Sequence, residues 1–586
     1  MSDAAAEVGS HPQRRAERIA AVGTVVAWSL FAYFAWRFDP YVVQWRLDAV
    51  WLAALVVLTL AIRSLSGSLL PVRVWLRDLP LPAALIAIFA AYWLPFYDNW
   101  RWAYTGDSIA WFATAAGAAT NGLRVDILSV HGVDDNFTYL HSLAFNFLMF
   151  VFEPTLFWHR VGKLIVSCLS LAMIYTYFAA TLSRRWAAAI VCGLATNYVW
   201  LWFSYVSYGH IDSHIFYFGT LLLATLIWQH PDHLGVWLLC GLLGGVSLFF
   251  TQTAWSAVVA VGAFLAGFGL VTRRRRGLVV YAMAFLLAGS PVLMQFRGLL
   301  EMTTRQAGSL YEWDYLVRIF TTILRLPFDS PVYHIGIYGA YLRWPLGQWY
   351  VAGTLIAALG VVPALRRWLR IPANAPVLLG LLLWDAVLMT LTNGGYGLPS
   401  SKRTYNLLPL HLFFALLPAY VVTQWLARWA WLRRGVVALV AVGMVVYAAN
   451  NLSLIMHPAP AVYGVNLLDG LIELRQRFPE RHVLLLTTRE EYPRILTPDS
   501  FFQRDYHLLD QVTVEPVFDD AMIEWTCAER MVLCYEPNAD SARFDPIHAR
   551  YAGVLRRFPL LNSNELACYE CLQPVAAIRS NAKRQG

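Results

Sequence analysis

A single carboxylate stands beside an apolar run in the stretch "RWAYTGDSIAWF". Asp107 is the only acidic residue between Arg101 and Phe112, and aromatic residues lie on both sides of it. A carboxylate within reach of a hydroxyl can act as a general base, and one at the start of a helix can cap it by accepting backbone N–H groups. Position alone leaves both roles open.

Two further segments carry polar residues that can form hydrogen bonds to a bound ligand. Asp134 and Asp135 are adjacent, so their side chains diverge and at most one of them faces a given site. His141 follows in an amphipathic aromatic stretch, which most simply lies in the membrane interface. The alternatives are a solvated pair of loop acids and a structural histidine.

The segment "GHIDSH" raises the question of a metal. His210 and His214 are four residues apart, the spacing that zinc sites use on one helix face. Asp212 would point elsewhere on a helix but joins them in a loop. Two histidines with one uncertain third ligand are weak evidence, so we predict hydrogen bonding to substrate by these three residues and no metal or other cofactor. A divalent ion is the open alternative.

Lys402 and Arg403 lie in a segment rich in Gly, Ser and Pro, directly before an apolar run. Arg can hold phosphate oxygens in a bidentate fashion, and Lys adds a point charge. We predict a phosphate site here. The alternative is that both side chains snorkel from the membrane to the interface.

The composition is that of a membrane protein. The chain has 586 residues, of which 58% are hydrophobic and only 14% are charged, with 25 tryptophans and 29 tyrosines. A soluble protein carries about 25% charged residues, and aromatic residues gather at membrane interfaces. The net charge of +8 does not predict nucleic acid as a partner, because its basic clusters sit between apolar runs.

Runs long enough to span a bilayer predict a polytopic all-α membrane protein of about thirteen helices. They fall near residues 18–37, 48–66, 80–97, 157–181, 186–206, 210–228, 234–250, 254–271, 277–296, 348–365, 374–392, 405–428 and 435–455. One run contains Asp385, which we expect to face a polar cavity or a partner, because a buried acid at membrane depth is costly.

Threading these runs places every strongly basic short turn on one face, including "RRRR" at 273–276 and "RRWLR" at 366–370. The positive-inside rule makes that face cytoplasmic, with a cytoplasmic tail at 1–17 and a transmembrane domain at 18–455 in the plasma (inner) membrane. The opposite face receives the loops 98–156, 297–347 and 392–403.

The C-terminal residues 456–586 also fall on the outer side and predict a small extracytoplasmic α/β domain. "LLDGLIELRQRF" has helical spacing, and "HVLLLTT", "RMVLCY" and "ELACYECL" are typical of strands. Four cysteines in this region suggest two disulfides, with the pairing open, against the alternative of a zinc site. They are Cys527, Cys534, Cys568 and Cys571.

Around these motifs the sequence resembles the GT-C glycosyltransferases, in the branch of the dolichyl-phosphate-mannose protein mannosyltransferases and the lipid A aminoarabinose transferase. Asp107 takes the place of the family's first acid, with Ser108 where the family has Glu. "FEPTLFWHRVGKL" is similar to the next motif and puts Arg160 at the family's arginine. "SSKRTYNLLPLHLF" is similar to a late block that meets the lipid phosphate, with Arg403 and Tyr405 aligned.

The resemblance implies an inverting enzyme that moves a sugar from a polyprenyl-phosphate donor to a lipid, protein or glycan acceptor on the outer (periplasmic) face. It favours catalysis over capping for Asp107, as the base that deprotonates the acceptor hydroxyl. It implies donor-phosphate binding by Lys402, Arg403 and Tyr405.

Three alternatives remain at this point. A transporter or flippase for a lipid-linked substrate would use Asp385 as a proton relay, but it predicts paired, broken helices that the sequence does not show. A metal-dependent polysaccharide ligase or polymerase would take a pyrophosphate-linked donor. A non-catalytic scaffold of the cell envelope is the third.

Overall fold

The structure, a computed structural model, describes residues 45–66, 147–205, 213–250, 254–294, 313–327, 342–392, 405–456, 465–488, 510–560 and 566–572, with single positions at 29, 83, 86, 87, 89, 90, 112 and 116. The chain divides into two compact units. The first comprises Met1–Asp98, Leu123–Phe145 and Val161–Ala459, and the second Asn99–Gly122, Asn146–Arg160 and Pro460–Gly586.

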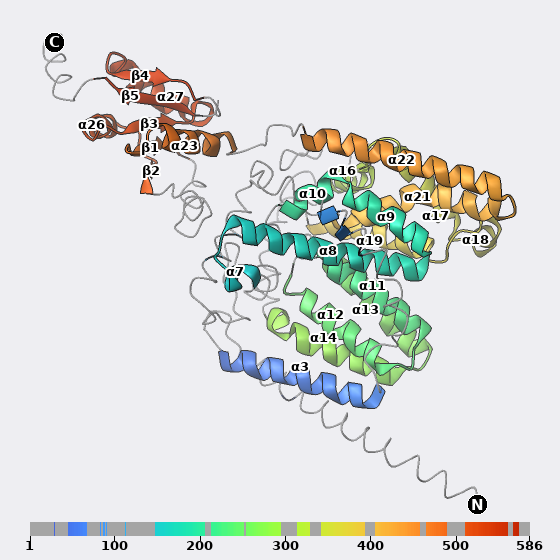
Figure 1. The fold of residues 1–586 in the computed structure, drawn as a ribbon. Helices are drawn as coiled ribbons and strands as arrows, with labels where there is room; N and C mark the ends of the chain where they lie inside the picture. The colour runs from blue at the N-terminus through green and yellow to red at the C-terminus, as the bar shows by residue number, and fades with distance from the viewer. Residues whose placement is uncertain are drawn as a thin grey trace, which may run out of the picture. The chain divides into compact units, whose positions relative to one another are not determined.

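Helices build the first unit (Figure 1). In chain order they are α3 (Trp45–Ser66), α8 (Leu156–Thr181, which begins in the second unit), α9 (Arg184–Ala195), α10 (Tyr198–Tyr205), α11 (Ser213–Gln229), α12 (Leu234–Ser247), α13 (Trp255–Val271), α14 (Arg275–Met294), α16 (Trp313–Arg325), α17 (Leu346–Leu359), α18 (Pro363–Leu369), α19 (Ala375–Thr392), α21 (Leu408–Trp425) and α22 (Ala430–Met456). The short helices η6 (Tyr405–Leu407) and η7 (Leu426–Arg428) also belong to this unit, whereas α7 (Phe147–Val151) belongs to the second unit.

Within the described residues, four helical stretches are long and apolar enough to cross a membrane: Ala49–Ser66, Leu156–Thr181, Leu408–Arg428 and Ala430–Ser453. Several shorter apolar helices accompany them, so the chain is an integral membrane protein. The predicted spans 18–37 and 80–97 lie almost wholly outside the described residues. The prediction of about thirteen spans is therefore confirmed only in part.

Two of the predicted spans are interrupted. The run 186–206 forms α9 and α10, because the Oδ1 of Asn197 accepts the backbone N–H of Val199 at 2.8 Å and of Trp200 at 3.1 Å and so starts a new helix. The run 348–365 forms α17 and α18, which begins at Pro363 because proline fits the first turn of a helix. A single unbroken helix was the wrong expectation in both places.

Close packing through glycine joins α12 to α14, which lie side by side (Figure 1). A Cβ added at Gly245 would lie 2.5 Å from the carbonyl oxygen of Phe285 and 2.7 Å from the Cβ of Ala288. Gly241, one turn earlier, meets the carbonyl oxygen of Tyr281 in the same way. Small residues four apart let two helix backbones approach, the usual way in which helices associate in a membrane.

Contacts between the turns agree with the predicted topology. Arg274, after α13, forms an ion pair with Asp232, after α11. Arg370, after α18, donates from Nη1 to the carbonyl oxygen of Gln424 at the end of α21. Turns that the sequence places on one side of the membrane therefore meet in pairs. That this side is cytoplasmic stays a prediction.

A five-stranded mixed sheet forms the core of the C-terminal residues. Its strands are β1 (Val483–Leu486), β2 (Val512–Glu515), β3 (Val532–Tyr535), β4 (Leu555–Phe558) and β5 (Ala567–Cys571), in the order β2-β1-β3-β5-β4, and the described helices beside them are α23 (Val465–Arg477), α26 (Asp520–Ala528) and α27 (Pro537–Arg550). β2, β1 and β3 run parallel, whereas β5 is antiparallel to both β3 and β4. The expected helix and three strands are present.

Two disulfides and one cross-strand ion pair link this sheet. Cys534 on β3 faces Cys568 on β5 and is bonded to it, and Cys527 of α26 is bonded to Cys571. The four cysteines, whose pairing the sequence left open, thus form two disulfides, and a disulfide-bonded cysteine cannot be a zinc ligand. Arg556 on β4 donates from Nε to the Oε1 of Glu570 on β5 at 2.9 Å.

Candidate functional site

The first turns of α8 bury three side chains that are cationic or can become so. His159 and Lys163 are fully buried, and Arg160 is 1% exposed. Arg160 and Lys163 are three residues apart and so share a helix face, which Ser167 continues one turn further on. Because α8 is apolar enough to cross a membrane, burying two cations in it is costly, and this makes the position a candidate functional site.

Phe112, which follows Asp107 in the sequence, contacts the start of α8. The ring of Phe112, five residues after Asp107, packs edge-on against the imidazole of His159, with 5.4 Å between ring centroids and 82° between ring planes. Phe112 and Ala116 are both helical and fully buried. The contact places the ring of Phe112 beside the residue that precedes Arg160.

A hydrogen bond joins two of the segments that the sequence singles out. Ser213, next to His214, donates from Oγ to the Oδ1 of Asn406 at 3.2 Å, and Asn406 follows Tyr405 in η6. His214 is buried, with its ring 4.8 Å from the ring of Trp200. The end of "GHIDSH" and the middle of "KRTYN" are therefore neighbours at one end of the helical unit.

The break between α9 and α10 is part of a buried polar network at the same end. Asn197 donates from Nδ2 to the hydroxyl of Tyr447 on α22. The backbone N–H of Tyr198 donates to the Oδ1 of Asn451, also on α22, at 3.2 Å. The guanidinium of Arg343 lies 5.9 Å from the centroid of the Tyr198 ring. These contacts satisfy the backbone groups that a helix break exposes, and they bring the cation of Arg343 onto α10.

Asp385 has a partner, as its burial required. The hydroxyl of Tyr217 on α11 donates to the Oδ2 of Asp385 on α19 at 2.5 Å, and both side chains are fully buried. The indole of the neighbouring Trp384 donates to the carbonyl oxygen of Ser256 at 3.1 Å. Asp385 and Trp384 together therefore tie α19 to α11 and α13.

The candidate residues divide into those the structure describes and those it does not. His214, Arg160 and Asp385 are described with their side chains, and Tyr405 by its backbone alone. The others lie outside the described residues, namely Asp107, Asp134, Asp135, His141, His210, Asp212, Lys402 and Arg403. Their roles stay predictions.

Metal ligation is open in the same way. Among the described residues no three His, Cys, Asp or Glu side chains converge as a metal site would need. Two of the three residues of "GHIDSH" that raised the question are not described, so the expectation of a metal-free site stays a prediction.

Several residues of this region were not singled out from the sequence. Lys163 stands three residues after Arg160 in an otherwise apolar run, and that spacing was a usable signal. Asn197 gave none, because what makes it notable is its contact with Tyr447, which no local pattern reveals.

No protein-family model matches the chain, and no curated protein matches it. Solved structures do match over most of its length. The apo structure of ArnT from Cupriavidus metallidurans superposes with a TM-score of 0.46 at 14% identity and covers 83% of this chain and 98% of its own. ArnT bound to undecaprenyl phosphate gives a TM-score of 0.44, also at 14% identity, over 83% of this chain and 97% of its own.

The apo oligosaccharyltransferase of Archaeoglobus fulgidus gives a TM-score of 0.44 at 12% identity, covering 84% of this chain and 74% of its own. ArnT and the oligosaccharyltransferase are both GT-C glycosyltransferases, the class of proteins that the sequence resembles. At identities of 12–14% and TM-scores of 0.44–0.46, the similarity assigns no activity, donor or acceptor.

Proposed function

We propose that the protein is an inverting glycosyltransferase that moves a sugar from a polyprenyl-phosphate donor to an acceptor at the outer (periplasmic) face of the membrane. Asp107 is the base, and Lys402, Arg403 and Tyr405 bind the donor phosphate. Residues that hold the sugar or the acceptor are drawn from Asp134, Asp135, His141, His210, Asp212 and His214. No resident cofactor is needed.

One observation carries this proposal, the contact of Phe112 with His159 beside the buried Arg160. It brings the segment of the candidate base to a helix that buries two cations. A polyprenyl phosphate is an anion on an apolar tail, so its binding requires cations at the edge of an apolar helix. Arg160 and Lys163 meet that requirement, because charge-assisted hydrogen bonds to phosphate are strong and a bilayer-length helix flanks the tail.

The reaction follows from these groups. The carboxylate of Asp107 takes the proton of the acceptor hydroxyl as its oxygen attacks the anomeric carbon from the face opposite the phosphate. The bond between that carbon and the phosphate oxygen breaks, and its electron pair leaves on the phosphate. Cations around the phosphate stabilise the charge that develops there, so no acid has to protonate the leaving group. The products are a glycosylated acceptor and a polyprenyl phosphate.

The hydrogen bond between Ser213 and Asn406 gives further support. It holds the end of a segment proposed to bind the substrate against the segment proposed to bind the donor phosphate. Sugar and phosphate are joined by a single bond in the donor, so the groups that bind them have to lie close together. A pair of segments 193 residues apart in sequence meets that condition.

Mass spectrometry of whole cells tests the function. Polyprenyl-linked sugars and envelope glycans are compared in cells with the protein, without it and with Asp107→Asn. We expect one sugar to be missing from its acceptor, and its polyprenyl-phosphate form to accumulate, in both the deletion and the variant. Transfer by Asp107→Asn at near the wild-type rate would exclude Asp107 as the base, and unchanged glycans in the deletion would exclude the function.

The bond between Tyr217 and Asp385 favours a second candidate, a proton-coupled transporter or flippase of a lipid-linked substrate. Buried, hydrogen-bonded acids inside membrane helices are a feature of the proton relays of pumps and transporters. The two functions separate in sealed vesicles that hold a fluorescent polyprenyl-phosphate sugar. A transporter changes the leaflet of the label without forming a new glycosidic bond, and Asp385→Asn abolishes that movement.

A further inference from the structure

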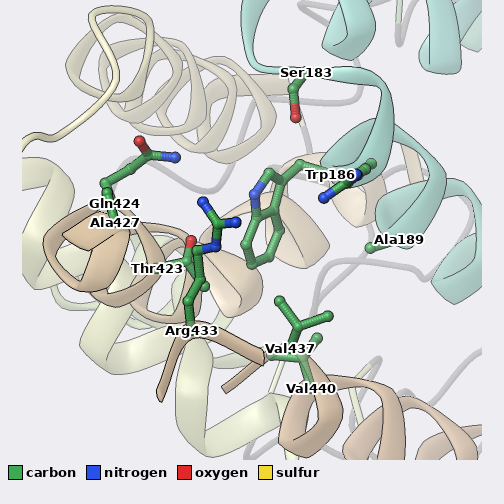
Figure 2. A pocket seen from close by; sticks show the side chains of 10 residues that line it. Ser183, Trp186, Ala189, Thr423, Gln424, Ala427, Arg433, Val437 and Val440 are labelled. Atoms are coloured by element: carbon green, nitrogen blue, oxygen red, sulfur yellow. The ribbon is translucent and has the colours of Figure 1, made fainter. Parts of the chain in front are cut away.

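A cavity of about 290 Å³ opens between α9, the end of α21 with η7, and α22 (Figure 2). It lies at the end of the helical unit that carries the basic turns, away from Ser213, Asn406 and the start of α8. The proposed transfer reaction makes no use of it. Two arginines, Arg185 and Arg433, reach its wall from separate helices.

Within the part of the chain that the structure describes, no acidic residue neutralises the positive charge of the two arginines that line the cavity. None of the residues that line the cavity is acidic, and neither Arg185 nor Arg433 forms an ion pair with another described residue. Gln424 and Ser183 add polar groups at the rim. Two cations with neutral hydrogen-bonding neighbours form a receptor for an oxyanion such as a phosphate.

The rest of the lining is apolar and continues onto the membrane surface of the protein. Figure 2 shows the indole of Trp186 and the guanidinium of Arg433 pointing toward one another, with Val437 and Val440 beneath them. Val437 is 53% exposed and belongs to α22, a helix long and apolar enough to cross the membrane. A ligand seated here has its anion against the arginines and an apolar tail along α22.

Aromatic residues place the cavity at the depth of lipid headgroups. Trp368, Trp425, Trp429 and Trp431 are all exposed near this end, and the rings of Trp368 and Trp425 lie 5.4 Å apart. Exposed tryptophans of this kind collect at the interface between membrane and water. A hydrogen bond from Arg370 to the carbonyl oxygen of Gln424 holds the turn after α18 against the rim.

We propose that this cavity binds the headgroup of an anionic phospholipid from the leaflet on the basic side of the membrane, with its phosphodiester between Arg185 and Arg433 and its acyl chains along Val437. Basic pockets between membrane helices on the cytoplasmic side bind lipid headgroups of this type. The site is separate from the donor site of the proposed reaction, and it neither requires nor contributes a catalytic group.

A lipid titration of the purified full-length protein in detergent tests the proposal, with fluorescent phosphatidylglycerol as the probe. The double variant Arg185→Gln/Arg433→Gln is compared with Arg63→Gln/Arg275→Gln, which removes the same charge from exposed arginines outside the cavity. We expect the first pair of substitutions to weaken lipid binding by about thirtyfold, because each basic residue near an anionic headgroup contributes about fivefold to the affinity. The second pair is expected to leave the affinity within about twofold of the wild type.

Two further arms fix the source of the phosphate and the role of the cavity. Phosphatidylcholine is expected to bind at least about tenfold more weakly than phosphatidylglycerol, and inorganic phosphate at the same concentration to displace neither lipid. Val437→Trp, which keeps every charge and fills the apolar wall, is expected to weaken binding as the arginine pair does. Equal loss in the control pair, displacement of the lipid by inorganic phosphate, or wild-type binding by Val437→Trp would each overturn the proposal.

Discussion

The imidazole of His159 packs edge-on against the ring of Phe112, with 5.4 Å between the centroids. This contact links Phe112, five residues after Asp107 in the sequence, to the turn of α8 that buries Arg160. In the proposed reaction it sets the distance between the base and the leaving phosphate. Catalysis is sensitive to displacements of about 1 Å in such a pair, so a contact between two residues that do no chemistry themselves matters for the rate.

Removing this contact is expected to slow transfer through positioning alone. Phe112→Ala and His159→Ala each remove one ring, and the double variant is expected to lose less than the sum of the two. The expected coupling energy is about 0.5–1.5 kcal/mol, the usual value for a pair of aromatic rings. The transfer rates of the wild type, the two single variants and the double variant in membranes measure this coupling energy. Phe112→Tyr, which keeps the ring, is the control. Additive losses would show that the two rings act independently.

Arg160 and Lys163 are expected to contribute to donor binding. Arg160→Gln and Lys163→Gln should each reduce transfer by about 10- to 100-fold, because a hydrogen bond to a charged group contributes about 1.5–3 kcal/mol. The binding of a polyprenyl phosphate that carries no sugar should weaken by a similar factor. Arg63→Gln removes an exposed arginine from the last turn of α3 and serves as the control. Normal binding by both variants, with transfer lost, would place the two cations outside the phosphate site.

Gly245 is expected to be intolerant of any side chain. In Gly245→Ala the added Cβ lies 2.5 Å from the carbonyl oxygen of Phe285, so α12 and α14 have to separate. Overpacking of this kind costs about 1–3 kcal/mol, and thermal unfolding in detergent measures it. Gly267→Ala on α13 is the matched control, because nothing lies within 4 Å of its added Cβ. Equal melting temperatures for the two variants would contradict the close approach of α12 and α14.

The stability of the C-terminal sheet is expected to fall in acid through Glu570. A hydrogen bond from Arg556 and the charges of Arg556 and Arg481 hold the pKa of Glu570 below its usual value, against the opposing effect of burial. The pKa of Glu570 is therefore lower in the folded protein than in the unfolded chain. The stabilisation that ionised Glu570 gives to the fold is fully present above its unfolded pKa of about 4.3, and it is lost as the pH falls through its pKa in the folded protein.

Glu570→Gln is therefore expected to destabilise the protein at pH 7, by about 0.2–1 kcal/mol because the ion pair is partly exposed, and to match the wild type once Glu570 is protonated. Thermal unfolding of the intact protein at several pH values gives both results. Glu529→Gln, a change at an exposed glutamate on the same domain, is the control. A difference that stayed constant from neutral to acid pH would rule out titration of Glu570 as the cause.

Much of the fold follows from hydrophobic patterning. Apolar runs located α8, α11, α13, α19 and α22, and short runs of Val, Leu and Tyr located β1, β3 and β5. The strands β2 and β4 were not predicted, because "VTVE" and "LRRF" are short and mix polar with apolar residues. The break at Asn197 was missed because one side-chain oxygen, and no change in hydrophobicity, starts α10.

The candidate site was predictable where a residue type is unusual for its surroundings. Asp385 stood out as an acid at membrane depth and Arg160 only through the family motif that it matches, and both are buried. The bond from Ser213 to Asn406 was not predictable, since it joins positions 193 residues apart, neither of which is charged. The sequence also left the pairing of the four cysteines open, because four cysteines allow three pairings. The register of β3 against β5 resolves it.

Both disulfides of the C-terminal domain have one partner in the last strand. Cys568 and Cys571 are three residues apart on β5, and their partners Cys534 and Cys527 come earlier in the chain. Neither bridge can close until residue 568 has been synthesised and has reached an oxidising compartment. A chain that stops short of this strand loses both cross-links together, so the final strand decides whether the domain is cross-linked at all.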